Sequence, residues 1–202
     1  MKTKIQTIKT FSELTKDEAE KYFENNTTEF EPHDDWHEST IESFTDALEL
    51  VGFYDVKIGF SGFWSQGDGA HFTGKYTYTK GALAKVKKEF PKWSELHQFA
   101  QELQELQRKC FYSMYMRITH SGYYQHENCT SFDFQDNRNQ YGYCSSDFDE
   151  NEWKECCRSF MQHIYSELEK EYNHISSFEY IWESKECFDH IEIVVDEVEE
   201  TI

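Results

Sequence analysis

The segment 60–72, Phe-Ser-Gly-Phe-Trp-Ser-Gln-Gly-Asp-Gly-Ala-His-Phe, combines residue types that are typical of a binding site. Its glycines let the backbone turn tightly or approach another group closely, and Asp68 lies where a turn presents a carboxylate. An aromatic ring, an amide and a carboxylate, from Trp64, Ser65, Gln66 and Asp68, can hold a small ligand such as a nucleotide signal by stacking and hydrogen bonds. Alternatively, Trp64 closes the end of the core, while Gln66 and Asp68 bond to loop amides. The sequence leaves both interpretations open.

A second candidate site consists of His120, Tyr124 and His126, with His71 as a further member. Imidazoles together with a carboxylate such as Asp68 are ligands that Zn²⁺ or Mn²⁺ accepts. The two later histidines lie on either side of a turn, so their approach depends on a strand register that the sequence does not fix. We therefore favour ordinary histidines of an antiparallel sheet, and we predict no metal and no cofactor. In a ligand pocket, Tyr124 would stack on the ligand beside Trp64.

A third run, His33-Asp-Asp-Trp-His37, precedes a helical pattern. Carboxylates at a helix start complement the helix dipole, which suffices to explain them.

The common catalytic motifs are absent from the sequence. The sequence contains no G-x-S-x-G elbow, no Walker loop and no H-E-x-x-H pair. An enzyme would have to assemble His120, His126 and Asp68 from separate strands. We therefore predict no catalytic residue and keep a metal-dependent enzyme only as an alternative.

The charge of the chain is large, negative and uneven. The 202 residues carry a net charge of −19. Residues 11–50 contain 13 acidic and 2 basic side chains, and residues 145–202 contain 17 and 4, whereas residues 51–144 are close to neutral. An acidic field repels phosphate and attracts basic surfaces, so we expect a basic protein partner and no direct nucleic-acid binding by the terminal segments. The alternative is that these acidic helices only keep the protein soluble.

Composition also gives expectations for the number of domains and for the cellular location of the protein. Aromatic residues make up 17% of the chain, which is typical of a folded protein. We predict one domain over 1–202, with a frayed acidic tail at 196–202. The N-terminus has no apolar signal region and no membrane span is visible, so we expect a cytoplasmic protein whose six cysteines are reduced.

The elements that would position these candidates form an α+β fold. Alternating apolar residues predict a meander of four antiparallel strands at about 53–61, 70–79, 111–120 and 123–135. Helical spacing predicts amphipathic helices over 11–23, 36–51, 81–90, 93–110 and 153–168, with Thr15 and Glu18 as a capping box. A short helix after Ser176 or Ser177 and a last strand at 191–195 complete the layout.

Several motifs in the middle of the chain resemble a family of small bacteriophage and prophage proteins. They are Phe60-Ser-Gly-Phe-Trp-Ser-Gln-Gly-Asp-Gly-Ala70, Tyr76-Thr-Tyr-Thr-Lys-Gly-Ala82, Ser94-Glu-Leu-His97 and Ile118-Thr-His120 with Gly122, Tyr124 and His126. Members of that family are labelled hypothetical proteins or antitoxins of a toxin–antitoxin stability system. The chain departs from the pattern at His71, where the family has a small serine, and in its longer acidic C-terminus.

Charge placement and resemblance together suggest a phage-type binding protein that inhibits a basic host defence or regulatory protein, in the sharper version as a DNA mimic. The alternatives are a small-molecule binder that uses the 60–72 loop and an antitoxin-like partner of a toxin. The sequence leaves the oligomeric state open.

Overall fold

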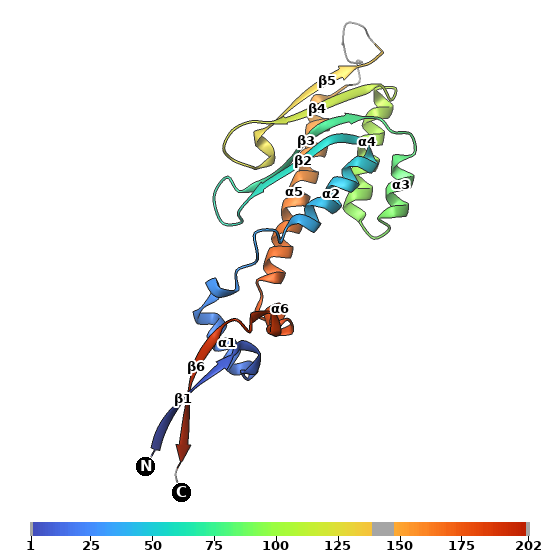
Figure 1. Ribbon diagram of the computed structural model, residues 1–202. Helices are drawn as coiled ribbons and strands as arrows, with labels where there is room; N and C mark the ends of the chain where they lie inside the picture. The colour runs from blue at the N-terminus through green and yellow to red at the C-terminus, as the bar shows by residue number, and fades with distance from the viewer. Residues whose placement is uncertain (1, 139–147, 201–202) are drawn as a thin grey trace. The chain divides into compact units, whose positions relative to one another are not determined.

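The computed structural model describes residues 2–138 and 148–200, and its residue contacts group into two compact units (Figure 1). Unit 1 contains Met1–Trp36 and Lys170–Ile202, and unit 2 contains His37–Glu169. The sequence prediction was one domain over 1–202, and the contacts within each unit are described separately.

Unit 2 contains the predicted four-stranded antiparallel sheet. Its strands are β2 (Phe53–Ser61), β3 (Gly69–Thr77), β4 (Met114–His120) and β5 (Thr130–Asp136). They lie in the order β2-β3-β4-β5, so that each strand pairs with its neighbour in the chain. The α+β class and the four-stranded meander are therefore confirmed.

Helices cover one face of this sheet. They are α2 (Glu38–Val51), α3 (Ala82–Glu89), α4 (Ser94–Lys109) and the N-terminal part of α5 (Glu150–Ile175). Met114, Met116 and Ile118 of β4 are buried, while Arg117 between them is exposed, which is the period-two pattern of a sheet with one covered face. Aromatic rings connect the layers, because Phe53 of β2 stacks near Phe99 of α4 with 6.1 Å between ring centroids.

Local signals mark the ends of α2 and α4. Gly52 follows α2 with a φ of 124°, a conformation that side chains disfavour. In α4, Arg108 and Lys109 occupy the last turn, where positive charge complements the helix dipole.

Unit 1 contains a strand pair, β1 (Lys2–Thr10) with β6 (Glu192–Glu200), and two helices, α1 (Lys16–Asn25) and α6 (Phe178–Glu183). The Thr15–Glu18 capping box begins α1, and Ser177 caps α6. Buried apolar residues form one cluster: Phe11, Leu14, Ala19, Phe30, Phe178, Ile181, Ile191 and Ile193.

Two sequence predictions need correction, and one strand was missed. The segment 123–135 is a strand only from Thr130, because residues before it form an irregular connection with a short 3₁₀ turn at Glu127–Cys129. Residues 196–200, expected to fray, pair with β1 in an antiparallel register. The strand β1 itself was not predicted. Within the described part of the chain, no helix is long and apolar enough to cross a membrane.

Candidate functional site

Two connections meet at one end of the four-stranded sheet, where the glycines on either side of Asp68 contact Tyr124 and His126. One joins β2 to β3 and contains Asp68; the other joins β4 to β5 and contains Tyr124 and His126. A Cβ built on Gly67 would lie 2.3 Å from Tyr124 Cδ1, and one built on Gly69 would lie 2.5 Å from His126 Cβ. Only glycine therefore permits this approach of the two connections.

Asp68 organises its own connection. Its Oδ2 accepts hydrogen bonds from the backbone N–H groups of Ser65, at 2.6 Å, and Trp64, at 3.1 Å. The Ser65 N–H bond is the main reason why the pKa of Asp68 lies below its usual range. Asp68 thus bonds to loop amides, as one of the two sequence interpretations predicted.

The remaining members of the 60–72 segment differ in exposure. Trp64 is 76% exposed and does not close the core, while Ser65 and Gln66 are also exposed. Phe63 anchors the connection instead, because its ring lies 5.4 Å from that of Tyr165 on α5, whose hydroxyl donates a hydrogen bond to the Gly62 carbonyl. The connection is therefore a fixed loop with an exposed indole on its surface.

His71 and His120 form a stacked pair. Their ring centroids are 3.8 Å apart and their planes differ by 10°. His71 Nδ1 donates to the Gln125 carbonyl, and His120 Nε2 donates to the Tyr124 carbonyl, so both rings hold the same backbone segment. Burial lowers the pKa of His71, which is 7% exposed, and the neighbouring His120 lowers it further.

His126 contacts other residues. Its Nδ1 accepts a hydrogen bond from the Asn128 N–H, and its Nε2 is 3.8 Å from Cys129 Sγ. Among the described residues, no three histidine, cysteine, aspartate or glutamate side chains are placed to hold a metal ion. The arrangement explains His71, His120 and His126 as side chains that fix the two connections.

A second feature of unit 2, which the sequence did not reveal, is a groove between α4 and α5. Three adjoining hollows of about 460, 100 and 370 Å³ share lining residues and form what we call the α4–α5 groove. Its floor is apolar, since Phe99 and Phe160 stack at 4.2 Å and both are 3% exposed. Six carboxylates line it: Glu95, Glu102, Glu105, Glu152, Glu155 and Glu167.

Few positive charges balance these carboxylates. Lys92 lies at one end of the groove, and Lys109 at the other donates to Glu152 at 2.5 Å. His163 Nε2 accepts a hydrogen bond from Trp93 Nε1 at 2.8 Å, which fixes the ring in the wall. Burial raises the pKa of the Cys156 thiol far above its usual range, so this cysteine is a neutral part of the groove.

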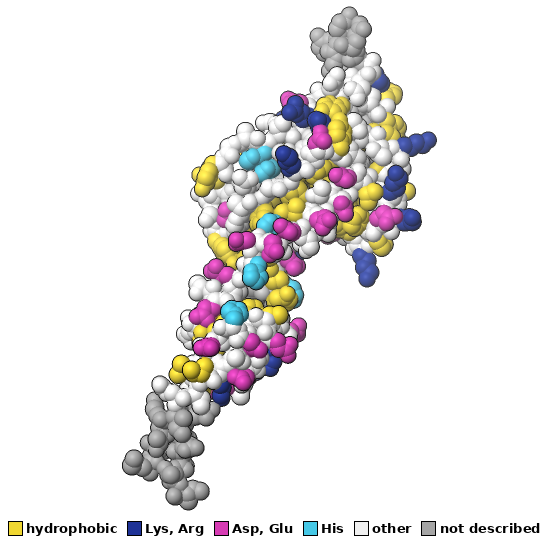
Figure 2. All heavy atoms as spheres, in the orientation of Figure 1, with side chains coloured by type: hydrophobic (Ala, Val, Ile, Leu, Met, Phe, Trp, Pro, Cys, Tyr) yellow, Lys and Arg dark blue, Asp and Glu magenta, His cyan; other side chains and the backbone are white. Residues whose placement is uncertain are grey.

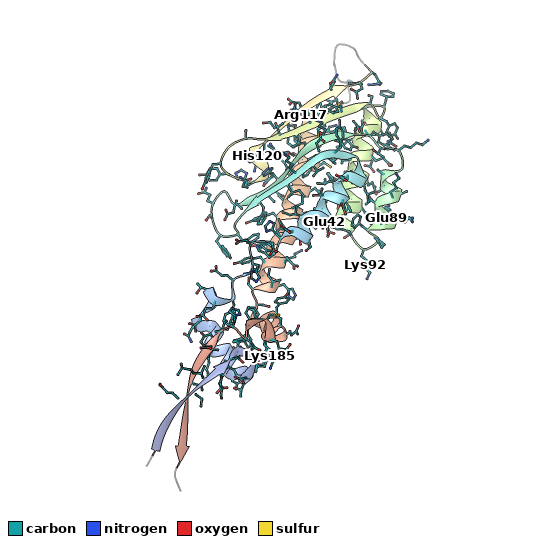
Figure 3. The ribbon with its side chains drawn as sticks, in the orientation of Figure 1. Glu42, Glu89, Lys92, Arg117, His120 and Lys185 are labelled. Atoms are coloured by element: carbon teal, nitrogen blue, oxygen red, sulfur yellow. The ribbon has the colours of Figure 1, made fainter. Side chains whose placement is uncertain are left out.

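Elsewhere on unit 2, acidic and basic side chains lie on different helices. On α2, Glu38, Glu42, Asp46 and Glu49 are exposed, and Glu42 is labelled in Figure 3. Lysines are exposed on and around α3: Lys80, Lys85, Lys87, Lys88 and Lys92. Figure 2 shows Lys and Arg side chains along the edge where Figure 1 places α3. The overall negative charge is therefore not spread evenly over unit 2.

Comparison with known proteins identifies a family. No curated protein and no solved structure matches the chain. A family described as "Domain of unknown function (DUF8835)" matches residues 36–177. This span contains all of unit 2 and ends two residues after α5. Since this span is well over half of the 202 residues, the chain belongs to the DUF8835 family.

Proposed function

We propose that the protein is a non-enzymatic binding protein that receives a basic segment of a partner protein in the α4–α5 groove. The carrying observation is a groove with an apolar floor and six carboxylates on its walls. A helix with apolar side chains on one stripe and lysine or arginine beside it matches both features, because an amphipathic helix lays its apolar face into such grooves.

The contribution of charge is selectivity and rate of association. Carboxylates on both walls attract a basic segment and disfavour an acidic one. Ion pairs between these carboxylates and the bound segment would also add affinity where the segment shields them from water. Lys109 already engages Glu152 in the end hollow, which Glu102, Glu105 and Glu155 also line. Glu102 and Glu105 accept hydrogen bonds from the neutral amides of Gln98 and Gln101, which leave their negative charge in place.

The resemblance to bacteriophage and prophage proteins suggests who the partner is. In that setting, the basic partner is a cytoplasmic host defence or regulatory protein, and occupation of its basic surface inhibits it. In the sharper version, the carboxylates stand in for DNA phosphates. The antitoxin label of the resembling family fits the same chemistry, with a basic toxin as the partner.

The test compares matched charge neutralisations in the full chain. The groove variant carries Glu102→Gln, Glu105→Gln and Glu155→Gln, and the control carries Glu38→Gln, Glu42→Gln and Glu49→Gln on α2. The probe is a fluorescein-labelled helical peptide of leucine and lysine, and its binding is followed by anisotropy at low and high salt.

We expect the groove variant to lose affinity by roughly tenfold, since exposed ion pairs contribute about 0.2–1 kcal/mol each, and the control to lose much less. Equal losses in the two variants would mean that the peptide responds only to net charge, and the proposal would be wrong. An unchanged affinity in the groove variant would also overturn it.

A further inference from the structure

Unit 1 contains a cavity of about 500 Å³ that the proposed function does not use. It lies between the segment that leads to α2, the C-terminal end of α5, α6 and the 3₁₀ turn at Lys185–Phe188. Its volume is in the range of sites that hold small ligands.

Aromatic rings form its apolar walls. Phe30, Trp36, Tyr180 and Phe188 all line the cavity. Phe30 and Phe188 are held in place by each other, with 5.2 Å between ring centroids, and Trp36 packs edge-on against Tyr172 at 5.4 Å. These contacts fix the walls independently of any ligand.

Carboxylates predominate among the titratable side chains around the cavity. Glu29, Glu31, Asp35 and Glu171 line it together with His33 and His190, and no lysine or arginine of the described residues does. Glu29 is partly engaged, because its Oε2 accepts a hydrogen bond from the Tyr22 hydroxyl at 2.8 Å, and burial together with this bond raises the pKa of Tyr22 to about 12. The other three carboxylates lie around aromatic walls.

We propose that this cavity binds a compact organic cation of the alkylammonium class. Aromatic faces attract such cations through the ring quadrupole, and carboxylates at the rim complete the charge balance. An anion would meet four carboxylates, and an uncharged apolar ligand would leave them without a counter-charge. A free quaternary amine and a lysine side chain of a partner share this chemistry.

The experiment titrates the full chain with choline and, in parallel, with 3,3-dimethylbutan-1-ol, which replaces the charged nitrogen by carbon and keeps the shape. Binding is followed by ligand-observed NMR. A third arm, Nα-acetyl-lysine amide, distinguishes a side-chain source from a free amine. We expect choline to bind and the uncharged analogue to bind roughly tenfold more weakly, as the loss of a cation–π contact implies.

Two variants locate the binding. Glu31→Gln with Asp35→Asn removes rim charge, and Glu20→Gln with Glu24→Gln removes the same charge from exposed positions on α1. Weaker choline binding in the first variant alone supports the proposal. Equal binding of choline and its analogue, equal effects of the two variants, or no binding of either ammonium probe would overturn it. Because Glu31 and Asp35 do not line the α4–α5 groove, the peptide test and this one fail separately.

Discussion

The contact between the two connections at the sheet end makes a sharp prediction for Gly67→Ala. Gly67 has a φ of 104°, and an added Cβ would lie 2.3 Å from the ring of Tyr124. Gly122 is a matched control in the other connection, because its φ is 109° but nothing lies within 4 Å of an added Cβ. Both changes strain the backbone by about 1–3 kcal/mol, and only Gly67→Ala also displaces a ring.

The size of the additional effect follows from the burial of Tyr124. This residue is 53% exposed, so about half of it is covered. An aromatic side chain buries about 200 Å² when covered fully, so displacement exposes roughly 100 Å². At about 25 cal/mol per Å², the loss is at most about 2.5 kcal/mol. We expect Gly67→Ala to lower the free energy of unfolding by about 1–2.5 kcal/mol more than Gly122→Ala does.

Urea unfolding of the two variants measures this difference, and a double-mutant cycle with Tyr124→Ala identifies its source. In the Tyr124→Ala background, Gly67→Ala should cost only the backbone strain, as Gly122→Ala does. If Gly67→Ala and Gly122→Ala differ by less than about 0.5 kcal/mol in the native background, the two connections are not packed as described and the reasoning is refuted.

Three further predictions concern titratable groups. Hydrogen bonds from Arg138 hold the pKa of the buried Asp136 far below its usual range. The ionised Asp136 therefore stabilises the fold fully at neutral pH, and this stabilisation declines as the pH falls below about 4. Asp136→Asn should lower the free energy of unfolding in urea by about 1–3 kcal/mol at pH 7 and by progressively less in acid. The lowered pKa of His71 means that the unfolded chain takes up this proton first, so stability should fall as the pH drops below about 6.5, and His71→Gln should flatten that part of the pH profile. Cys187 is exposed, whereas burial raises the thiol pKa of Cys156 and Cys157, so iodoacetamide should label Cys187 before Cys156 and Cys157 in the native protein, as peptide mass analysis would show.

Local patterns were sufficient to predict most of unit 2. The alternation of apolar residues located β2 over 53–61, although an irregularity between Tyr54 and Lys57 shifts its register and Phe53 is its one fully buried residue. The capping box at Thr15 and Glu18 was recognisable because it depends only on residues three apart, and α1 begins directly after it at Lys16. The predicted helix began too early, at residue 11, where the chain forms a 3₁₀ turn. The sequence also predicted Asp68 as a turn residue. It could not predict which N–H groups donate hydrogen bonds to the Asp68 carboxylate, because that depends on the conformation of the whole loop.

Features that depend on distant segments were not predictable. The pairing of β1 with β6 joins Lys2 to Glu200, and no local pattern reports such a partner. Charge counting could not predict the acidic groove. Glu95, Glu102 and Glu105 belong to the stretch 51–144, in which basic residues balance the acidic ones. Five of the lysines, Lys80, Lys85, Lys87, Lys88 and Lys92, are exposed on and around α3, so the neutral sum concealed two surfaces of opposite sign.

The composition of unit 1 from both ends of the chain has a consequence for biosynthesis. Residues 37–169 of unit 2 leave the ribosome as one continuous stretch, so its sheet and helices can assemble during translation. The first 36 residues emerge before them but must wait for Lys170 and the residues after it, including β6, the partner of β1. Until then Phe11, Leu14 and Phe30, which are buried in the finished protein, remain without their partners from α6. The nascent chain therefore carries an exposed apolar segment throughout the synthesis of unit 2, and this is the interval in which a chaperone would bind it.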